Sequence, residues 1–373
     1  MSRPALDHAP GIYFDLAAEE YHADSALSAS GMKRLMTGPL EFWRNSVLNP
    51  HREEVETDAK ELGTAFHKRL LEGRDLFQQH YGVELDRDDF PSALSGADTL
   101  KEQCKTMGLP VSGTIAVLCA RILEADPEAQ LWPVLVEENA AANEGKILLS
   151  ASAFARIEAS AALVEAHPDA RRALRDGYSE VSIFWTDDET GIRLKARLDY
   201  LRLRAVVDLK TFSNRNGKPI DRAVVEAVAR ERYYIQAVVY VEACEAAKTL
   251  IKADPGCVHG PVDPAFITEF ANSPQHGFVF VFLESCGFPA IRVRSFDQLE
   301  PGAKKGASQN LYWLMGVSCF RYAVSLYKDC VNTFGTDRPW TDYGEIHANG
   351  TIPSFRDEDF PQWMFDDQGL SQQ

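Results

Sequence analysis

An acidic and a basic residue stand close together in an otherwise apolar run, and their types could hold a metal ion beside a proton carrier. Asp208 and Lys210 lie two positions apart in Ala205–Thr211, a segment rich in β-branched residues. Residues i and i+2 of a strand point to the same face, so the carboxylate and the ammonium should emerge side by side. Burying an isolated charge is costly. Three interpretations therefore stay open: a solvated strand face, a structural salt bridge, or a metal-binding carboxylate beside a lysine.

The elements that position this pair are predicted as three consecutive antiparallel strands between Glu180 and Phe212. The second strand, residues 192–201, alternates between two kinds of side chain. One face carries Ile192, Leu194, Ala196, Leu198 and Tyr200, and the other carries Arg193, Lys195, Arg197 and Asp199. The acidic loop that precedes it ends at Gly191 and suits a hairpin. The polar face of this strand therefore carries three cations followed by one carboxylate.

Two predicted helices carry further polar groups. A helix over residues 221–248 would place Tyr233, Gln236 and Tyr240 on one face. Upstream, residues 61–71 form a helical run that contains His67. Downstream, residues 277–284 and 289–296 read as two strands that extend the sheet, and residues 307–330 read as a long helix that covers the core.

Taken in order, these segments resemble the motifs of RecB-like nucleases of the PD-(D/E)xK superfamily. The motifs are Gly-Thr-Ala-Phe-His67, Leu-Asp199, Asp208-Leu-Lys210 and Gln236-Ala-Val-Val-Tyr240. The flanks are similar to phage and prophage exonucleases of the RecE or exonuclease VIII type. They are Leu27-Ser28-Ala-Ser30-Gly-Met-Lys33, leading to Pro39, and Ile352-Pro353 through Trp363. The resemblance covers most of the chain apart from about residues 82–142.

The resemblance implies an α/β fold, a PD-(D/E)xK nuclease core whose mixed central sheet is flanked by helices, with a small helical insertion. We expect an N-terminal helical part of the core in residues 1–80, the insertion in residues 95–126, and the catalytic sheet with a C-terminal helix in residues 143–373. The insertion resembles a SAP motif, a helix-extended-helix DNA-binding module, through its link Gly108-Leu-Pro-Val-Ser-Gly-Thr114. Ile115 stands where that family usually has lysine, so the insertion is either a DNA-holding module or a structural element.

The resemblance also implies the roles of the site residues. Asp199, Asp208 and the backbone carbonyl of Leu209 would bind Mg²⁺ or Mn²⁺, ions that prefer oxygen ligands. His67 would assist with a second ion, and Glu180 is either an accessory ligand or an exposed acid at a strand end. Lys210 would orient or deprotonate the attacking water. Asp208 and Lys210 are expected on a polar strand face, where their removal costs little stability. The expected DNA contacts are Gln236, Tyr240, Arg193, Lys195 and Arg197.

Composition bounds the function. The chain has 373 residues, a net charge of −16 and 45% hydrophobic residues, so it can bury a large core but cannot coat DNA by charge alone. Lys and Arg nevertheless outnumber Asp and Glu between residues 171 and 232. No signal sequence or membrane-spanning run is evident, and the seven scattered cysteines fit reduced thiols, which together predict a cytoplasmic protein without membrane contact.

The resulting hypothesis is a metal-dependent exonuclease that acts on double-stranded DNA ends, degrading one strand in the 5′ to 3′ direction for phage-type recombination. The resemblance further suggests a homo-oligomer and a single-strand annealing protein as partner. Two other hypotheses stay open: a structure-specific or restriction-type endonuclease on the same core, and a non-catalytic DNA-end-binding protein.

Overall fold

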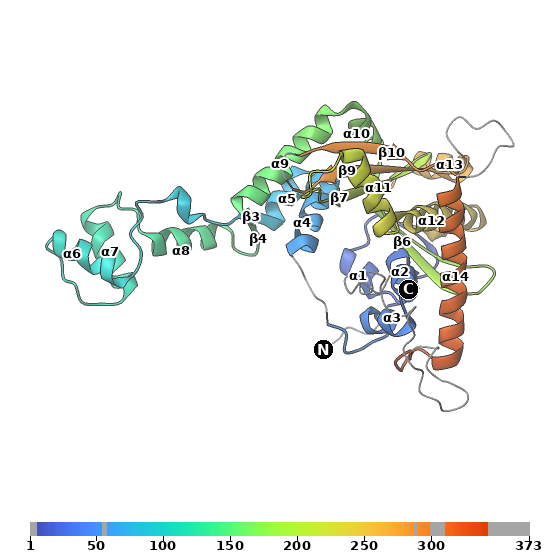
Figure 1. The fold of residues 1–373 in the computed structure, drawn as a ribbon, viewed down its shortest axis with the longest axis horizontal. Coiled ribbons are helices and arrows are strands. Elements are labelled where there is room, and N and C mark those ends of the chain that lie inside the picture. The colour runs from blue at the N-terminus through green and yellow to red at the C-terminus, as the bar shows by residue number, and fades with distance from the viewer. Residues whose placement is uncertain (1–5, 54–57, 287–288, 299–309, 342–373) are drawn as a thin grey trace, which may run out of the picture.

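A mixed β-sheet of eight strands forms the centre of the computed structural model (Figure 1), which describes residues 6–53, 58–286, 289–298 and 310–341. The strand order is β10-β9-β7-β6-β5-β1-β8, and β2 pairs with β6. The strands are β1 (Gly11–Tyr13), β2 (Leu27–Ser28), β5 (Gly177–Thr186), β6 (Arg193–Arg202), β7 (Ala205–Phe212), β8 (Val258–His259), β9 (Gly277–Glu284) and β10 (Ile291–Ser295). A separate parallel pair joins β3 (Tyr81–Val83) to β4 (Ile147–Leu149).

The three strands predicted from alternation are confirmed. β5 pairs antiparallel with β6, and β6 pairs antiparallel with β7. The predicted extension of the sheet is also confirmed, because β9 runs parallel to β7 and β10 runs antiparallel to β9. Both parallel and antiparallel neighbours therefore surround β7, the strand that carries the acid–lysine pair.

The sheet opens between β6 and β7. Their register comprises Tyr200 with Val207 and Leu201 with Val206. Further along β6, the short strand β2 pairs with Leu194 and Lys195 instead. A backbone group that leaves a ladder needs another partner. The divergence therefore frees backbone donors on β7 at the position of Asp208 and Leu209.

Helices cover both faces of the sheet (Figure 1). The larger core cluster packs β-strand residues such as Val206, Phe212 and Phe280 against the N-terminal and C-terminal helices. These are α2 (Ala29–Leu35), α3 (Pro39–Asn45), α11 (Ile220–Arg230), α12 (Tyr233–Ala253), α13 (Pro264–Asn272) and α14 (Leu311–Phe334). Tyr21 of α1 (Ala18–Ala23) packs in a smaller cluster with Ala26 and Phe184.

The second cluster packs Val207 and Leu209 against helices from the middle of the chain. These are α4 (Asp58–His67), its π-helical extension Lys68–Glu72, α5 (Arg74–His80), α9 (Ala151–Ala166) and α10 (Pro168–Ala173). Alternate residues of β7 thus point into opposite layers. The α/β fold with a mixed, helix-flanked sheet is confirmed.

The single helix predicted over residues 221–248 is wrong in one respect, since two helices occupy this region. The break falls after Arg230, and Arg232 takes a left-handed backbone conformation with φ of 51°. No glycine or proline marks the break in the sequence. It lets α12 start a new axis at Tyr233, close to β7.

The segment between β3 and β4 projects from the body as an arm, residues 84–146, at the left of Figure 1. It contains a short 3₁₀ turn (Arg87–Asp89), α6 (Ala97–Thr106), α7 (Ile115–Ala125) and α8 (Trp132–Ala142). Helices α6 and α7 and the link between them occupy the predicted insertion, and its likeness to a SAP module stays a prediction. Leu94 and Leu131 form a parallel bridge at the base of the α6–α7 unit. That unit has its own core of Leu100, Cys104, Leu118, Cys119, Ile122 and Leu131.

The predicted C-terminal helix is confirmed over its described part as α14, and all seven cysteines are free thiols. The C-terminal motif around Ile352, Pro353 and Trp363 lies outside the described residues. Among the helices that the structure describes, none is long and apolar enough to cross a membrane.

Candidate active site

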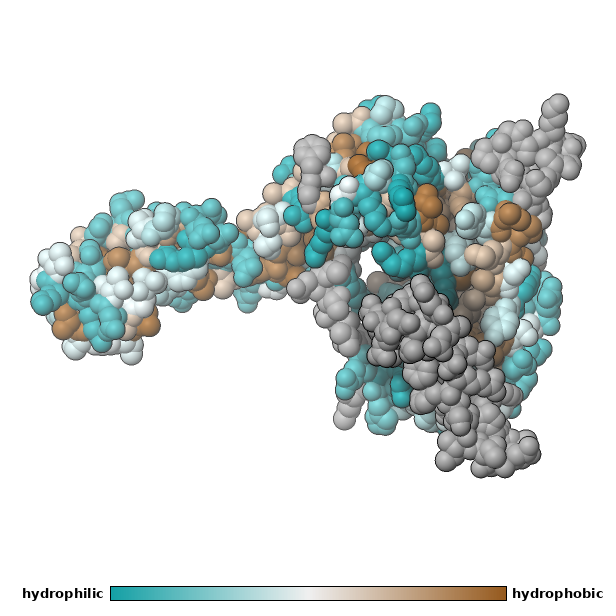
Figure 2. All heavy atoms as spheres, viewed as in Figure 1, coloured by the Kyte–Doolittle hydropathy of each residue, from teal (hydrophilic) through white to brown (hydrophobic). Residues whose placement is uncertain are grey.

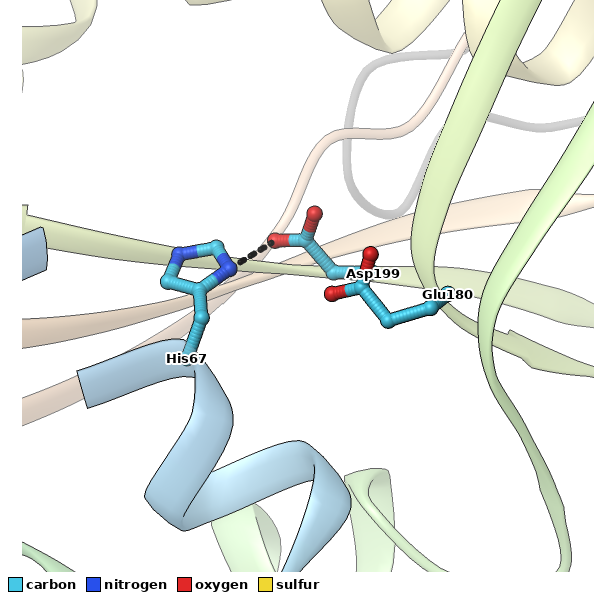
Figure 3. A group of neighbouring side chains, drawn as sticks. All are labelled: His67, Glu180 and Asp199. Carbon is cyan, nitrogen blue, oxygen red and sulfur yellow. Dashed lines mark ion pairs between the residues drawn. The ribbon is translucent and has the colours of Figure 1, made fainter. Parts of the chain in front are cut away.

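Three potential metal ligands meet beside the opening between β6 and β7. His67 is the last residue of α4, Glu180 lies on β5 and Asp199 lies on β6. One ligand atom from each falls within 4.8 Å of the others, and Figure 3 shows the three side chains converging. His67 Nδ1 lies 3.8 Å from Asp199 Oδ2. Residues more than a hundred positions apart thus form one cluster.

His67 is held by the backbone of β7. Its Nε2 lies 3.1 Å from the carbonyl oxygen of Leu209. Because a carbonyl oxygen can only accept, this contact places the ring proton on Nε2 and leaves the Nδ1 lone pair toward Asp199. Burial lowers the pKa of His67, with a further lowering by the nearby Lys210 charge. The imidazole is therefore neutral at pH 7, the form that binds metals.

The Asp199 side chain hydrogen-bonds to β7 where β6 and β7 diverge. Its Oδ2 accepts a hydrogen bond of 2.7 Å from the backbone N–H of Leu209. This bond replaces the ladder bond that the diverging strands cannot make. Burial raises the pKa of Asp199. The carboxyl keeps its other oxygen for a ligand role.

Asp208 is completely buried, at 0% exposure, which overturns the expectation that it lies on a solvated face. Its Oδ1 accepts a 2.8 Å hydrogen bond from Gln236 Nε2. Its Oδ2 lies 2.6 Å from Lys210 Nζ, but this ion pair is not angled for a hydrogen bond. Burial raises the pKa of Asp208 to about 6, although the Lys210 charge opposes the rise.

Lys210 is nearly enclosed, with 14% of its side chain exposed, so it too lies inside the protein rather than on a polar strand face. Burial alone would lower its pKa, but the carboxylates of Asp208 and Asp199 outweigh burial and raise it. The ammonium stays protonated at neutral pH. Its charge suits it to orient water or to face a phosphate better than to accept a proton.

Glu180 reaches the cluster through an unusual backbone. The β5–β6 register pairs the residues on either side of it and leaves Glu180 out, and its φ is 55°. A non-glycine residue in this region is strained, a condition that clusters at functional sites. Its Oε2 accepts a 2.6 Å hydrogen bond from Arg197 Nε. Burial and the Asp199 charge raise its pKa.

The cluster fits a hard divalent cation. Its donors are the carboxylates of Glu180 and Asp199 and the imidazole of His67, and the Asp208 carboxylate and Leu209 carbonyl lie on the neighbouring strand, a set that suits Mg²⁺ or Mn²⁺. Burial raises the pKa of each of Glu180, Asp199 and Asp208, so each carboxylate would gain from a bound positive charge. The buried Asp208 Oδ2 lacks a hydrogen bond as well.

The structure places Gln236 and Tyr240 behind the acids. Gln236 bonds Asp208 directly. Burial raises the pKa of the Tyr240 phenol well above its usual value, against a smaller opposing effect of its contact with Gln236. The phenol therefore stays protonated. A contact of either residue with DNA stays a prediction.

The three cations predicted on β6 are engaged within the protein. Arg193 pairs with Asp24 and Asp7. Lys195 is buried and donates to the backbone carbonyls of Tyr21 and Asp24, each at 2.7 Å. Arg197 bonds Glu180 and the Leu16 carbonyl. The first two fasten the N-terminal segment to the sheet, and a contact with DNA stays a prediction for all three.

Sequence reasoning assigned no role to Lys33, although α2 places it beside the site. Its ammonium lies 5.1 Å from the centroid of the Tyr233 ring, and Lys210 lies 5.3 Å from the same centroid. The only sequence signal was its place in the N-terminal motif that begins at Leu27.

Comparison with known proteins supports this architecture. The family described as PDDEXK-like domain of unknown function (DUF3799) matches residues 28–252, more than half of the chain. The match spans Lys33, His67, both aspartates, Lys210, Gln236 and Tyr240. No sequence among the curated proteins matches the chain.

One similar solved structure is that of the "Putative exonuclease" from Eubacterium rectale, with 13% identity and a TM-score of 0.46 over 94% of this chain and 97% of that chain. The chain belongs to the family of PDDEXK-like domains on the strength of its match to residues 28–252.

Proposed function

We propose that the protein is a divalent-metal-dependent nuclease that hydrolyses phosphodiester bonds in DNA. The observation that carries the proposal is the convergence of His67, Glu180 and Asp199 next to the buried Asp208–Lys210 pair. Membership in a PDDEXK-like family supports the same reaction class. A purely structural salt bridge would not need two further acids and a neutral histidine beside it.

The residues that would hold the ion are Asp199, Asp208, the Leu209 carbonyl, Glu180 and His67. When bound, Mg²⁺ or Mn²⁺ polarises the phosphate and lowers the pKa of an attacking water. Asp199 and Asp208 are held for this role by Leu209 N–H and Gln236. Arg197 in turn holds Glu180. These contacts fix the ligand oxygens before substrate arrives, so little reorganisation is needed.

Lys210 would act on the substrate side of the site. Its ammonium keeps its charge because of the neighbouring carboxylates. A fixed positive charge stabilises the additional negative charge that develops on the phosphate oxygens during attack. The same ammonium can orient the water. We therefore favour an electrostatic and orienting role over general-base catalysis for this lysine.

A second observation favours a nucleic-acid substrate. Arg171, Arg172 and Arg175 line a hollow of about 340 Å³ at the start of β5. Asp176, in the same hollow, is four residues before Glu180 in the sequence. Asp169 and Glu165 pair with two of these arginines. Even so, cations in this hollow can contact phosphates that lie away from the one being cleaved.

The RecE-like resemblance leads us to propose attack at ends of double-stranded DNA, 5′ to 3′ removal of one strand, and a homo-oligomer that works with a single-strand annealing protein. An endonuclease on the same core is the second candidate. A binding protein without catalysis is disfavoured by the presence of Lys210 beside the acids.

One gel separates these functions. Linear and covalently closed circular duplexes of equal length are incubated with the protein and Mg²⁺. Loss of the linear duplex alone supports an exonuclease, and cutting of both supports an endonuclease. If neither is cut with Mg²⁺ or Mn²⁺, the proposed nuclease function is wrong.

A further inference from the structure

Lys33 is a cation at the site with no role in the reaction described above. It lies on α2, and its ammonium sits 5.1 Å from the centroid of the Tyr233 ring. Lys210 approaches the same ring at 5.3 Å. The two ammonium groups are therefore no more than about 10 Å apart. The aromatic ring of Tyr233, the first residue of α12, thus contacts both positive charges.

The charge on Lys33 is poorly compensated. Within the described part of the chain, its ammonium contacts the Tyr233 ring but makes no hydrogen bond or ion pair. Burial and, less strongly, the charge of Lys210 lower its pKa to about 8, against weaker opposing effects of Asp208 and Glu231. A cation–π contact contributes roughly 0.5–2 kcal/mol, less than the cost of enclosing an ammonium beside another cation. Among the described residues, the Lys33 ammonium has neighbouring acids but no anion in direct contact with it.

We propose that Lys33 binds a non-bridging oxygen of a substrate phosphate, so that Lys33 and Lys210 flank the sugar–phosphate backbone across Tyr233. This inference rests on the proposed nuclease function. Successive phosphates of one strand rise roughly 3.4 Å along a duplex, so two lysines this close can reach one phosphate or two neighbours. Lysine binds phosphate as a point charge and does not require a planar partner.

The phosphate has two sources in a DNA end. It is either the terminal 5′-phosphate or an internal phosphate beside the scissile bond. Both present non-bridging phosphate oxygens to Lys33. DNA ends with a 5′-phosphate or a 5′-hydroxyl distinguish the two phosphates.

The test compares Lys33→Met, which keeps the apolar stem without the charge, with Lys33→Arg, which keeps a charge. Lys252→Ala, an exposed lysine on α12 with no part in the site, serves as control. DNA affinity is measured in Ca²⁺ at several salt concentrations, and kcat and KM are measured in Mg²⁺ on ends with a 5′-phosphate or a 5′-hydroxyl.

For Lys33→Met we expect about tenfold weaker DNA binding and a salt-dependence slope reduced by roughly 0.7–0.9, the loss of one phosphate contact. Lys33→Arg should recover most of the slope, and Lys252→Ala should match the wild type. A defect confined to 5′-phosphorylated ends assigns the terminal phosphate, and a defect on both ends assigns an internal one.

Unchanged KM and salt slope in Lys33→Met, with or without a lower melting temperature, overturn the inference and leave Lys33 as a packing residue on Tyr233. Failure of the proposed function looks different, because the wild type itself would then not cut DNA with Mg²⁺ or Mn²⁺. In that case the inference falls with it.

Discussion

Gln236 on α12 donates a 2.8 Å hydrogen bond to Oδ1 of Asp208 on β7, and the acceptor is a fully buried carboxylate. The amide thereby satisfies one oxygen and leaves the other to Lys210 and to a bound ion. Such a partner orients a metal ligand without touching the metal. The bond gives the amide a partner in the apolar first half of α12.

Replacing Gln236 by Ala should weaken metal binding. The change leaves Asp208 Oδ1 buried without a donor, which raises the carboxyl pKa further and favours the protonated form. We expect Mn²⁺ affinity, measured by calorimetry, to fall about 10- to 100-fold. Gln78→Ala, on the exposed face of α5, is the control. Weaker DNA binding in Ca²⁺ with unchanged Mn²⁺ affinity would instead make Gln236 the DNA contact that its sequence position predicts.

Lys210→Ala should abolish hydrolysis and also destabilise the fold. Removing one partner of a buried ion pair leaves the other charge uncompensated, at a cost of about 3 kcal/mol. Urea unfolding at pH 7 measures this loss. The double variant Asp208→Asn with Lys210→Met removes both charges and should be less destabilised than Lys210→Ala. Equal stability of wild type and Lys210→Ala would contradict the burial of the pair.

Metal removal should stop the reaction reversibly. EDTA is expected to abolish cleavage, and excess Mg²⁺ or Mn²⁺ should restore it. Ca²⁺ should support DNA binding without cleavage, because its looser coordination polarises water and phosphate less. Cleavage assays and gel shifts on the same duplex measure both effects. Persistent cleavage in EDTA would rule out the metal mechanism.

Metal binding should depend on pH through the buried carboxyls. Burial raises the pKa of Asp208 from 3.8 to about 6, so the metal-free folded protein holds a proton that the unfolded chain has lost. The corresponding stability is present below pH 4 and disappears as the pH rises through about 6. A metal ion binds the deprotonated carboxylate, so in the presence of metal the stability increases as the pH rises.

The rise in melting temperature that Mn²⁺ produces relative to EDTA should therefore grow between pH 5 and pH 7. Thermal unfolding in buffers of matched ionic strength measures it. An equal rise at both pH values would show that proton release is not coupled to metal binding.

The sequence predicted the strands well and the site only in part. Alternation from Ile192 to Tyr200 defined β6, since side chains on successive residues must face opposite sides. The same pattern indicated a polar face, whereas Asp199 and Lys195 are buried. Burial was not predictable because the partners, Leu209 N–H and the carbonyl of Asp24, come from other elements.

Three other features of the structure have almost no signal in the local sequence. The turn that ends α11 uses Arg232 in a left-handed conformation rather than glycine, so residue preference favoured an unbroken helix. The positive φ of Glu180 is likewise imposed by tertiary contacts. Lys33 became visible as a site residue only when α2 was seen beside Tyr233.

The arm offers a test that keeps the body intact. Leu94 donates a backbone hydrogen bond to the Gln130 carbonyl and accepts one from the Trp132 N–H, so residues 95–129 can be replaced by a short Gly-Ser-Gly link. If the arm holds DNA, the deletion should shorten the tract degraded per binding event and reduce salt-sensitive affinity, while short duplexes are still cleaved. Long duplexes degraded as processively as by the full-length protein would leave the arm a structural or partner-binding element.

The charges of the arm favour a modest effect. Arg121 donates to the carbonyl oxygens of Pro110 and Ser112 and so fixes the turn between α6 and α7. Val111, Ile115 and Val117 are exposed there, and Figure 2 shows apolar surface on the arm among hydrophilic residues. The double variant Lys101→Ala with Lys105→Ala keeps the arm but removes two of its cations. Comparing it with the deletion distinguishes an effect of the arm's charge from an effect of its presence.

The paired base of the arm bears on how such a protein can change over evolutionary time. A segment whose two ends are already held together adds little loop-closure entropy when it grows or shrinks. Its separate core means that the nuclease sheet need not repack. We therefore expect related chains to gain, lose or exchange this module as a unit, with the catalytic residues unaltered. The same junction would accept an engineered domain that brings the nuclease a new target.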